Sequence, residues 1–373
     1  MVSALGGFVV AGLLLTLAAD SSAATGREWA LHEAAAKAEL ATVRELLAPR
    51  EATGWRAWLQ PPPLGVDARD ERGRTALHFA AQSAAGGEAS HLVVAALLGS
   101  GAAVDSVDDL GCTPLMLAAA IGSAQVCELL LENGADPNVA TTGANEDFDL
   151  LETPLVAAAW HGHEAAVEVL LRGGAMTEQR LASGNTALHE AVEAGQTDVV
   201  RKLVAHGADA NARGGDRGAT PLHIAVWKFS EKSAKAPSAA AIATVLIEDG
   251  ADVSAEDERG HSAVHHATED GKPTMLKLLL DAGAKSDQAG MQHRPLAQIR
   301  TRDGLPPLHL ALHGGKSGKA SAVRAAKACA EVLLGAGANL EEVDGHGGTA
   351  LHWTAHESDE ELTRYTHTHT HPN

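Results

Sequence analysis

The fold is decided by one stretch, residues 184–212, which reads GNTALHEAVEAGQTDVVRKLVAHGADANA. Thr186 stands where a helix N-cap is expected, because its hydroxyl can accept a hydrogen bond from an unpaired backbone N–H. Apolar residues then recur at helical spacing up to Gly195 and again up to Gly207, where the left-handed conformation ends a helix at no steric cost. Two short amphipathic helices cannot bury their apolar faces alone. The stretch therefore predicts a unit that stacks on copies of itself.

Copies of this unit run along the chain. The capping position recurs as Thr, Ser or Pro at Thr75, Thr113, Thr153, Thr220, Ser262, Pro306 and Thr349. The shortest step, from Thr153 to Thr186, is 33 residues, and the longest, from Ser262 to Pro306, is 44. A period near 33 with occasional excess is typical of a solenoid built from helix pairs. The sequence thus predicts one elongated repeat domain.

Composition narrows the classes of partner. The chain has 373 residues with 29 Lys and Arg against 48 Asp and Glu, a formal net charge of −19. Such a charge argues against a nucleic-acid backbone or an anionic membrane surface as the main partner. Aromatic residues make up only 3% of the chain, which favours closely stacked helices over a large aromatic core.

The three cysteines are too few and too widely spaced for a zinc pattern or a disulfide framework. Cys127 and Cys329 are expected to be small buried apolar residues of the repeats. Cys112 precedes a helix cap and is expected on an exposed loop.

The N-terminal segment stands apart from the repeats. Residues 4–19 are apolar and uncharged, and small residues follow at 21–23, so residues 1–23 read as a signal peptide or a signal anchor. An anchor would leave the repeats facing the cytosol, because the first positive charges follow the apolar run. The sequence therefore predicts a secretory-pathway or membrane-associated protein, with a cytoplasmic location as the alternative. No Asn-x-Ser/Thr acceptor for glycosylation supports passage through the lumen.

Three further segments depart from the repeat. Residues 49–69 form an insert with three consecutive prolines, in which Trp55 and Trp58 either pack on the first repeats or make an exposed docking element. The final unit, from residue 348, shows a first helix and a polar remnant, as a cap would. Residues 361–373 are a His/Thr-rich tail expected to be disordered.

The repeated TPL or TALH, followed by a Val/Leu-rich helix and GADxN, resembles the ankyrin repeat family over residues 28–360, about nine units including degenerate caps. The resemblance implies an all-α repeat solenoid of stacked helix-turn-helix units with hairpin-like loops. It also implies a concave face for partner proteins and no catalytic activity. Departures at four motif positions weaken it locally: Met116, Leu151, Val156 and Pro306.

Histidine recurs at one motif position, at His78, His189, His223, His265, His309 and His352. One per stacked unit makes a ladder and not a cluster, so a metal or acid–base site is not expected there. The resemblance implies that each ring bonds to backbone and to the capping Thr.

Other candidate sites are weaker. The stretch GGKSGKAS at residues 314–321 lacks the glycine spacing of a phosphate loop and follows a helix. His356, His367, His369 and His371 could bind a transition metal, but no acidic or cysteine ligand sets a geometry. The sequence therefore predicts no catalytic, cofactor or metal residue.

The sequence predicts a non-enzymatic protein-interaction scaffold or adaptor that binds one or more proteins, and no nucleic acid, through loop tips and first helices. The alternative is a membrane-tethered or secretory component with the repeats as a spacer, and a membrane contact is expected only if residues 4–19 anchor the chain. An enzyme subunit is a third hypothesis, with no residues to support it. The partner-binding positions, expected to be free of fold constraints, are Arg72, Arg74, Phe79, Leu110, Leu117, Asn185, Glu190, Arg217, Ile224, Arg259 and His261.

Overall fold

The structure is a computed structural model, and its described residues are 26–48, 65–83, 88–141, 153–215, 217–228, 236–288, 295–313, 320–356 and 360–370. The chain divides into two compact units, residues 1–207 and 208–373. The boundary falls after the second helix of one repeat and before the loop of the next. That the repeats form a single domain over 28–360 stays a prediction.

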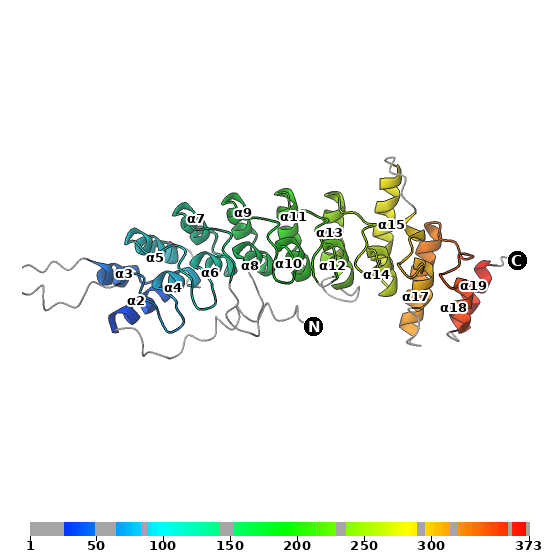
Figure 1. Cartoon of the computed structure of the whole chain (residues 1–373), viewed down its shortest axis with the longest axis horizontal. Helices are drawn as coiled ribbons and strands as arrows, with labels where there is room; N and C mark the ends of the chain where they lie inside the picture. Colours follow the sequence, from blue (N-terminus) through cyan, green and yellow to red (C-terminus); the bar gives the residue numbers. More distant parts are fainter. Residues whose placement is uncertain are drawn as a thin grey trace, which may run out of the picture. The chain divides into compact units, whose positions relative to one another are not determined.

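The first unit is a stack of helix pairs. In Figure 1 its first helices lie in one row and its second helices in another, and each helix packs on its counterpart in the adjacent pair. The first helices are α2 (Gly26–Ala36), α4 (Ala76–Gln82), α6 (Pro114–Ala120), α8 (Pro154–His161) and α10 (Ala187–Ala194). The second helices are α3 (Leu40–Leu47), α5 (Glu88–Gly99), α7 (Ala124–Glu132), α9 (Glu164–Arg172) and α11 (Thr197–Ala205).

The second unit repeats this arrangement with longer second helices. Its first helices are α12 (Pro221–Lys228), α14 (Ala263–Glu269), α16 (Pro307–His313) and α18 (Ala350–His356). Its second helices are α13 (Ala236–Glu248), α15 (Pro273–Gln288), α17 (Ala320–Gly335) and α19 (Glu360–Thr370), with a short 3₁₀ helix, η2 (Leu296–Gln298), after α15.

The local signals read from residues 184–212 act as expected. Thr186 is the N-cap of α10, and its backbone N–H donates to Nδ1 of His189 at 3.2 Å. Gly195 ends α10 at φ 80°, and Gly207 follows α11 at φ 85°. The left-handed conformation ends each helix, and glycine is favoured at both positions because a side chain would be strained there.

The first helices from α2 to α12 each bury one leucine in the core, and a small alanine three residues later allows close helix contact. Leu31, Leu77, Leu115, Leu155, Leu188 and Leu222 are all at most 1% exposed. Burying one such side chain stabilises the folded chain by about 2–3 kcal/mol before entropy losses. The stack therefore derives its stability from repetition of this contact.

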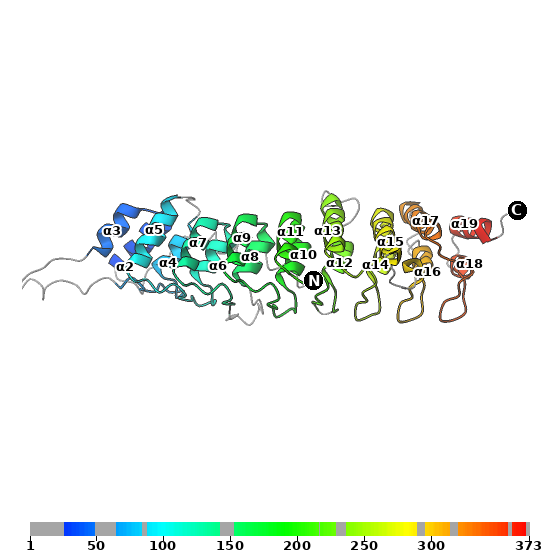
Figure 2. The same ribbon diagram turned by 90° about the horizontal axis from the view of Figure 1, so that it is seen from above.

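The loops between pairs are hairpin-like. Antiparallel bridges join Gly214 to Ala219, Glu256 to Ser262 and Val343 to Thr349. Within the described ranges these bridges are isolated and no named strand forms. Figure 2 shows the loops of each unit extending beyond the row of first helices. The all-α repeat solenoid with hairpin-like loops is confirmed.

Two expectations are wrong. Residues 360–370 form helix α19 and not a disordered tail: Leu362 is 1% exposed, and the Thr366 hydroxyl lies 3.2 Å from that of Thr354 on α18. The polar composition hid a narrow buried stripe at i and i+4. Cys112 is 6% exposed and not on an exposed loop surface, because its side chain packs with Met116 and Leu117.

Several predicted features lie outside the described residues: the apolar segment 1–23, the tryptophans of the 49–69 insert, the 314–319 loop and residues 371–373. Among the helices that the structure describes, none combines the length and the apolar character needed to span a bilayer.

Candidate functional site

In each of four loops, the side chain of one aspartate is hydrogen-bonded to the backbone of the same loop. Its Oδ1 accepts hydrogen bonds from the backbone N–H groups two and four residues later. In the first such loop, Asp70 accepts from Arg72 at 2.9 Å and from Arg74 at 2.8 Å. The same pair of bonds is made by Asp108, Asp257 and Asp344. The aspartate side chains are largely covered by their loops. The hydrogen bonds to backbone N–H groups fix the loop conformation, so it does not depend on the side chains at the tip.

A glycine three residues after each of these aspartates completes the turn. Gly73 has φ 73° and Gly260 has φ 75°. A Cβ on Gly73 would lie 2.7 Å from Asp109 Oδ1, and one on Gly260 would lie 2.7 Å from the backbone N of Arg302. Glycine is therefore required at both positions for two reasons: the turn has a positive φ, and the next loop approaches too closely to leave room for a Cβ.

Neighbouring loops are bonded to one another. The backbone N–H of Asp109 donates to the carbonyl oxygen of Arg72 at 2.9 Å, and that of Glu258 donates to the carbonyl oxygen of Arg217 at 2.9 Å. The Arg69 guanidinium adds a bond to the carbonyl oxygen of Val107 at 2.8 Å. Within each unit, such bonds order adjacent loops as a row.

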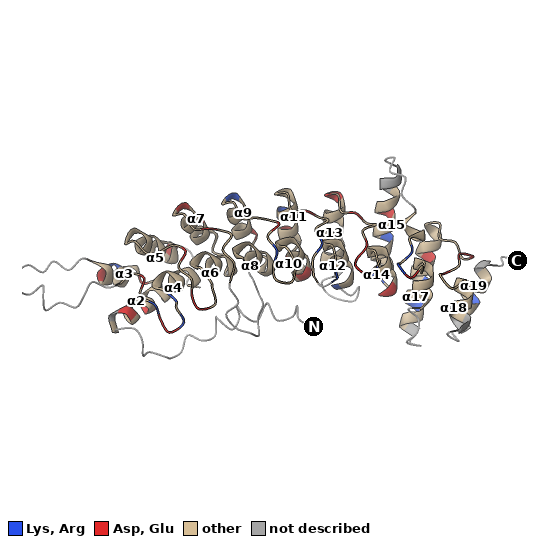
Figure 3. Ribbon diagram, in the orientation of Figure 1, with Lys and Arg blue, Asp and Glu red and all other residues tan. Residues whose placement is uncertain are grey.

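The two residues between the aspartate position and the glycine form the tip of each loop. We call these residues the tip pairs. Their described members are exposed, except Leu110, which is half-buried. The first unit has Glu71, Arg72, Asp109, Leu110, Ala182 and Ser183, and the second unit has Arg217, Glu258, Arg259, Arg302, Asp303, Gly345 and His346. Figure 3 shows the charged residues gathered on loops and helix ends, with the first helices largely uncharged.

The eleven predicted partner-binding positions divide by exposure. Arg72, Arg217 and Arg259 are exposed; Arg74, Leu110, Glu190 and His261 are half-buried; Phe79, Leu117, Asn185 and Ile224 are at most 9% exposed. The expectation that the fold leaves these positions unconstrained is wrong for the last four.

Specific contacts account for the burial. The Arg74 guanidinium pairs with Asp70 at 2.8 Å and lies 4.4 Å from the centre of the Phe79 ring, which also stacks on His32. Leu117 belongs to the apolar cluster around Cys112. Asn185 donates from Nδ2 to Glu190 Oε1 at 2.9 Å. The residue before the cap and the residue four after it thus contact each other within one repeat.

The histidine ladder is structural. His78 Nδ1 accepts from the backbone N–H of Thr75 at 3.1 Å, so the proton is on Nε2, which donates to the carbonyl oxygen of Cys112 at 3.0 Å. Burial lowers the pKa of His78 to about 4. The ring is therefore neutral at neutral pH and ties each repeat to the next. His223 and His265 make the same pattern, and burial likewise lowers the pKa of each to about 4.

Two rings of the ladder lack a capping partner. His32, which extends the ladder into the first repeat, donates from Nε2 to Ala68 at 3.0 Å, and His309 donates to Gly348 at 3.0 Å. Nδ1 of each is buried without a hydrogen-bond partner. At His309 the cause is Pro306, which offers neither a hydroxyl nor an N–H where other repeats have Thr or Ser.

One repeat of the second unit gathers a different set of groups. Nitrogens of His261 and His266 and a carboxylate oxygen of Glu269 all lie within 4.8 Å of one another. Asp257, whose side chain is fully buried, holds His266 Nε2 at 3.1 Å. Burial lowers the pKa of His266, so its ring is neutral at neutral pH. The His261 and His266 rings lie 5.3 Å apart between centroids.

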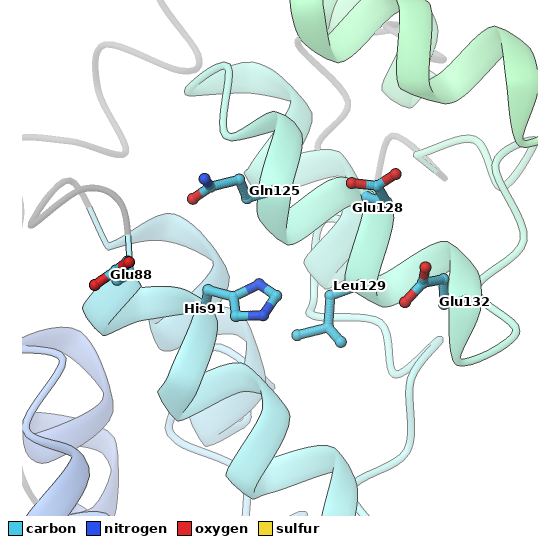
Figure 4. A pocket seen from close by; sticks show the side chains of 6 residues that line it. All are labelled: Glu88, His91, Gln125, Glu128, Leu129 and Glu132. Carbon is cyan, nitrogen blue, oxygen red and sulfur yellow. The ribbon is translucent and has the colours of Figure 1, made fainter.

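A shallow hollow of about 400 Å³ lies between α5 and α7 on the second-helix side of the first unit. Figure 4 shows Glu88 and His91 on one helix facing Gln125, Glu128, Leu129 and Glu132 on the other. The lining is acidic and carries no hydroxyl or thiol nucleophile. The acidic lining therefore suits binding of a cationic group and offers no nucleophile for catalysis.

These features define, within each unit, a stack of helix pairs joined by hairpin-like loops, and the comparisons agree with this repeat architecture. The family described as Ankyrin repeats (3 copies) matches residues 31–141, 83–179 and 155–236, and Ankyrin repeat matches 217–258. Because these matches cover more than half of the chain, it belongs to the ankyrin repeat family.

Individual relatives share the repeats. The E3 ubiquitin-protein ligase KEG of Arabidopsis thaliana is 26% identical over 87% of this chain, and the ankyrin repeat and KH domain-containing protein CBG24701 of Caenorhabditis briggsae is 35% identical over 38%. The matched regions make up 20% and 6% of those two proteins. The ankyrin repeat domain of human ASB11 superposes with a TM-score of 0.51 at 26% identity, covering 68% of this chain and 96% of that domain.

These relatives support a protein-interaction role and give no support to the membrane or secretory alternative. The fold is one that generally carries no catalytic activity. KEG is named as a ligase, but only a fifth of its length is matched.

Sequence reasoning missed two features. The loop aspartates were visible as a repeated Asp-x-x-Gly five residues before the cap, at residues 70–73, 108–111, 257–260 and 344–347. The cluster of His261, His266 and Glu269 was not, because only the turn of the loop onto α14 brings His261 to the other two. The sequence predicts His261 only as a partner-binding position.

Proposed function

We propose that this chain is a protein-binding scaffold or adaptor that recognises its partners through the tip pairs of consecutive repeats. The observation that carries the proposal is the combination of exposed tips with loops held from inside by aspartate and glycine. A preformed loop loses little conformational entropy on binding, so more of the contact energy appears as affinity. The role requires no catalytic group.

In the second unit three successive tip pairs each carry an arginine, and Glu258 and Asp303 are the other members of two of these pairs. Arg217, Arg259 and Arg302 are exposed on three successive loops, although the chain as a whole is acidic. Arginine presents a planar set of donors that suits carboxylates and exposed backbone carbonyls of a protein partner. We therefore assign these tips the leading part in partner contact.

The test compares two variants of the full chain in affinity capture with quantitative mass spectrometry. The tip variant carries Arg217→Glu, Arg259→Glu and Arg302→Glu. The control carries Arg201→Glu, Lys277→Glu and Arg324→Glu, which change the net charge equally at exposed positions of α11, α15 and α17. We expect proteins captured by the natural chain to be lost from the tip variant and kept by the control. Equal capture by both variants would contradict the proposal.

A further inference from the structure

The cluster in the second unit is distinguished by which histidine nitrogens the fold already uses. Four histidine rings meet around α14: His223, His261, His265 and His266. His223 and His265 have both nitrogens engaged, Nδ1 with the capping residue and Nε2 with a backbone carbonyl of the following segment. His261 and His266 are the two rings that retain a nitrogen for another ligand.

One ring nitrogen of His261 lacks a hydrogen-bond partner. Its Nδ1 is buried and has no hydrogen-bond partner, and Glu269 Oε2 is 3.9 Å away. A buried polar atom without a partner is unfavourable, so a ligand that binds to this nitrogen is favoured. Glu269 is exposed and can rotate toward it.

His266 is oriented by the protein. Asp257 Oδ2 holds its Nε2 at 3.1 Å, while Oδ1 of the same carboxylate is fixed by the backbone N–H groups of Arg259 and His261. A carboxylate that accepts from one ring nitrogen leaves the opposite nitrogen, Nδ1, with its lone pair free and makes it more basic. Asp257 is therefore a positioning residue for His266.

The three side chains come from three motif positions: the residue before the cap, the residue four after it and the residue seven after it. In the repeat capped by Thr75, for comparison, these positions hold Arg74, Phe79 and Gln82, which do not form a set of metal ligands. Only where they are His261, His266 and Glu269 do two imidazoles and a carboxylate meet, within the described part of the chain.

We propose that His261, His266 and Glu269 bind a divalent transition-metal ion of the zinc class. Two imidazoles and one carboxylate are ligands that zinc prefers, at about 2.0–2.2 Å each. The ligand atoms lie within 4.8 Å of one another. To bind one metal ion together, the exposed Glu269 side chain must rotate toward the rings and the two rings must move slightly closer to each other. Three protein ligands leave a fourth position for water or for a side chain of a bound protein.

The experiment uses the full chain in which His367, His369 and His371 are replaced by alanine, so that the tail cannot bind metal. Zinc is titrated by calorimetry, and cobalt(II), which reports its geometry through visible absorption, is titrated in parallel. We expect one equivalent of each metal to bind. Adding His261→Ala or His266→Ala should weaken binding by about tenfold or more, and Glu269→Gln should weaken it less.

The matched control is His346→Ala, which removes an exposed loop histidine of the same unit and should leave binding unchanged. Circular dichroism confirms that each variant is folded; His261→Ala should fold because it removes a half-buried ring whose Nδ1 has no hydrogen-bond partner. Asp257→Asn should weaken cobalt binding, because an amide that donates to Nε2 leaves the proton on Nδ1, the nitrogen that would bind the metal. The proposal would be overturned if the tail-substituted chain bound no zinc. It would also be overturned if His261→Ala and His266→Ala left its zinc affinity unchanged.

Discussion

Pro306 shows how one residue changes the environment of another. It occupies a capping position, and it leaves Nδ1 of His309 buried without a partner. In the corresponding place, the Thr220 hydroxyl lies 2.8 Å from Nδ1 of His223 and its N–H donates to the same atom. The repeat that begins at Pro306 therefore lacks two hydrogen bonds that its neighbours make.

Replacing Pro306 by threonine should restore them. We expect Pro306→Thr to raise the free energy of unfolding by about 1 kcal/mol, measured by urea denaturation, with part of the gain offset by the lost rigidity of proline. Pro306→Ala supplies the N–H alone and should gain less. In a His309→Ala background the gain should vanish, and a gain of equal size there would contradict the assigned partner.

His78 makes stability depend on pH. Its folded-state pKa of about 4 lies below the value of the unfolded chain, so the unfolded state binds the proton first as pH falls. Stability is therefore complete above about pH 6.5 and decreases toward pH 4. As the pH falls from about 7 to 5, the titration of His78 should lower the free energy of unfolding by about 2 kcal/mol.

The measurement is denaturation of the natural chain and of His78→Gln at both pH values. The other histidines titrate alike in both proteins, so the difference in stability between them should shrink by about 2 kcal/mol at the lower pH. A difference that does not change with pH would show that burial of His78 has no such effect.

At the level of the element, each hairpin-like loop depends on its aspartate. Asp108 accepts from the backbone N–H groups of Leu110 and Cys112 at 3.0 and 2.8 Å. Asp108→Ala should lower the free energy of unfolding by about 1–3 kcal/mol, because two largely buried donors lose their partner. Hydrogen exchange should show faster exchange of the same two amides. Asp109→Ala, which removes an equal charge at the exposed tip, should change stability by less than about 0.5 kcal/mol.

Leu362 is the fully buried large apolar residue among the described side chains of helix α19. Leu362 is 1% exposed in an otherwise polar helix. Leu362→Ala should cost about 2–3 kcal/mol locally and release residues 360–370, seen as loss of amide protection there. Thr368→Ala, at an exposed position of the same helix, is the control and should leave protection unchanged.

How far the sequence predicts the elements follows from their signals. Periodic leucines, Thr caps and terminal glycines predicted the helix pairs and the capping role of Thr186, because these signals are local. Helix α19 was missed because two buried side chains, Leu362 and Thr366, make too weak a pattern. The burial of Phe79 and Ile224 and the meeting of His261 with His266 depend on contacts across a loop, which spacing in the sequence does not contain.

On the scale of the whole molecule, each unit is a one-dimensional stack in which a repeat contacts only its neighbours. A cavity at the end of the stack should therefore be felt less widely than one in its interior. Leu31 lies in the first described pair of the first unit and Leu155 in a central one, and both are at most 1% exposed.

We expect Leu155→Ala to lower amide protection from α6 to α10, at a cost of about 2–4 kcal/mol. Leu31→Ala removes the same atoms and should lower protection mainly in α2 and α3. Native-state hydrogen exchange on the full chain resolves the two patterns. Equally widespread loss in both variants would mean that the first unit unfolds as one block.

The loop aspartates have a consequence for how such a protein evolves. Because Asp70, Asp108, Asp257 and Asp344 hold their loops through backbone atoms, the turn does not require a particular side chain at the tip. Selection for folding and selection for recognition thus act on different residues a few positions apart. The chain can change its partners by drift at the tip pairs while its stability stays nearly constant, and a library of binders could be built on it by varying those residues alone.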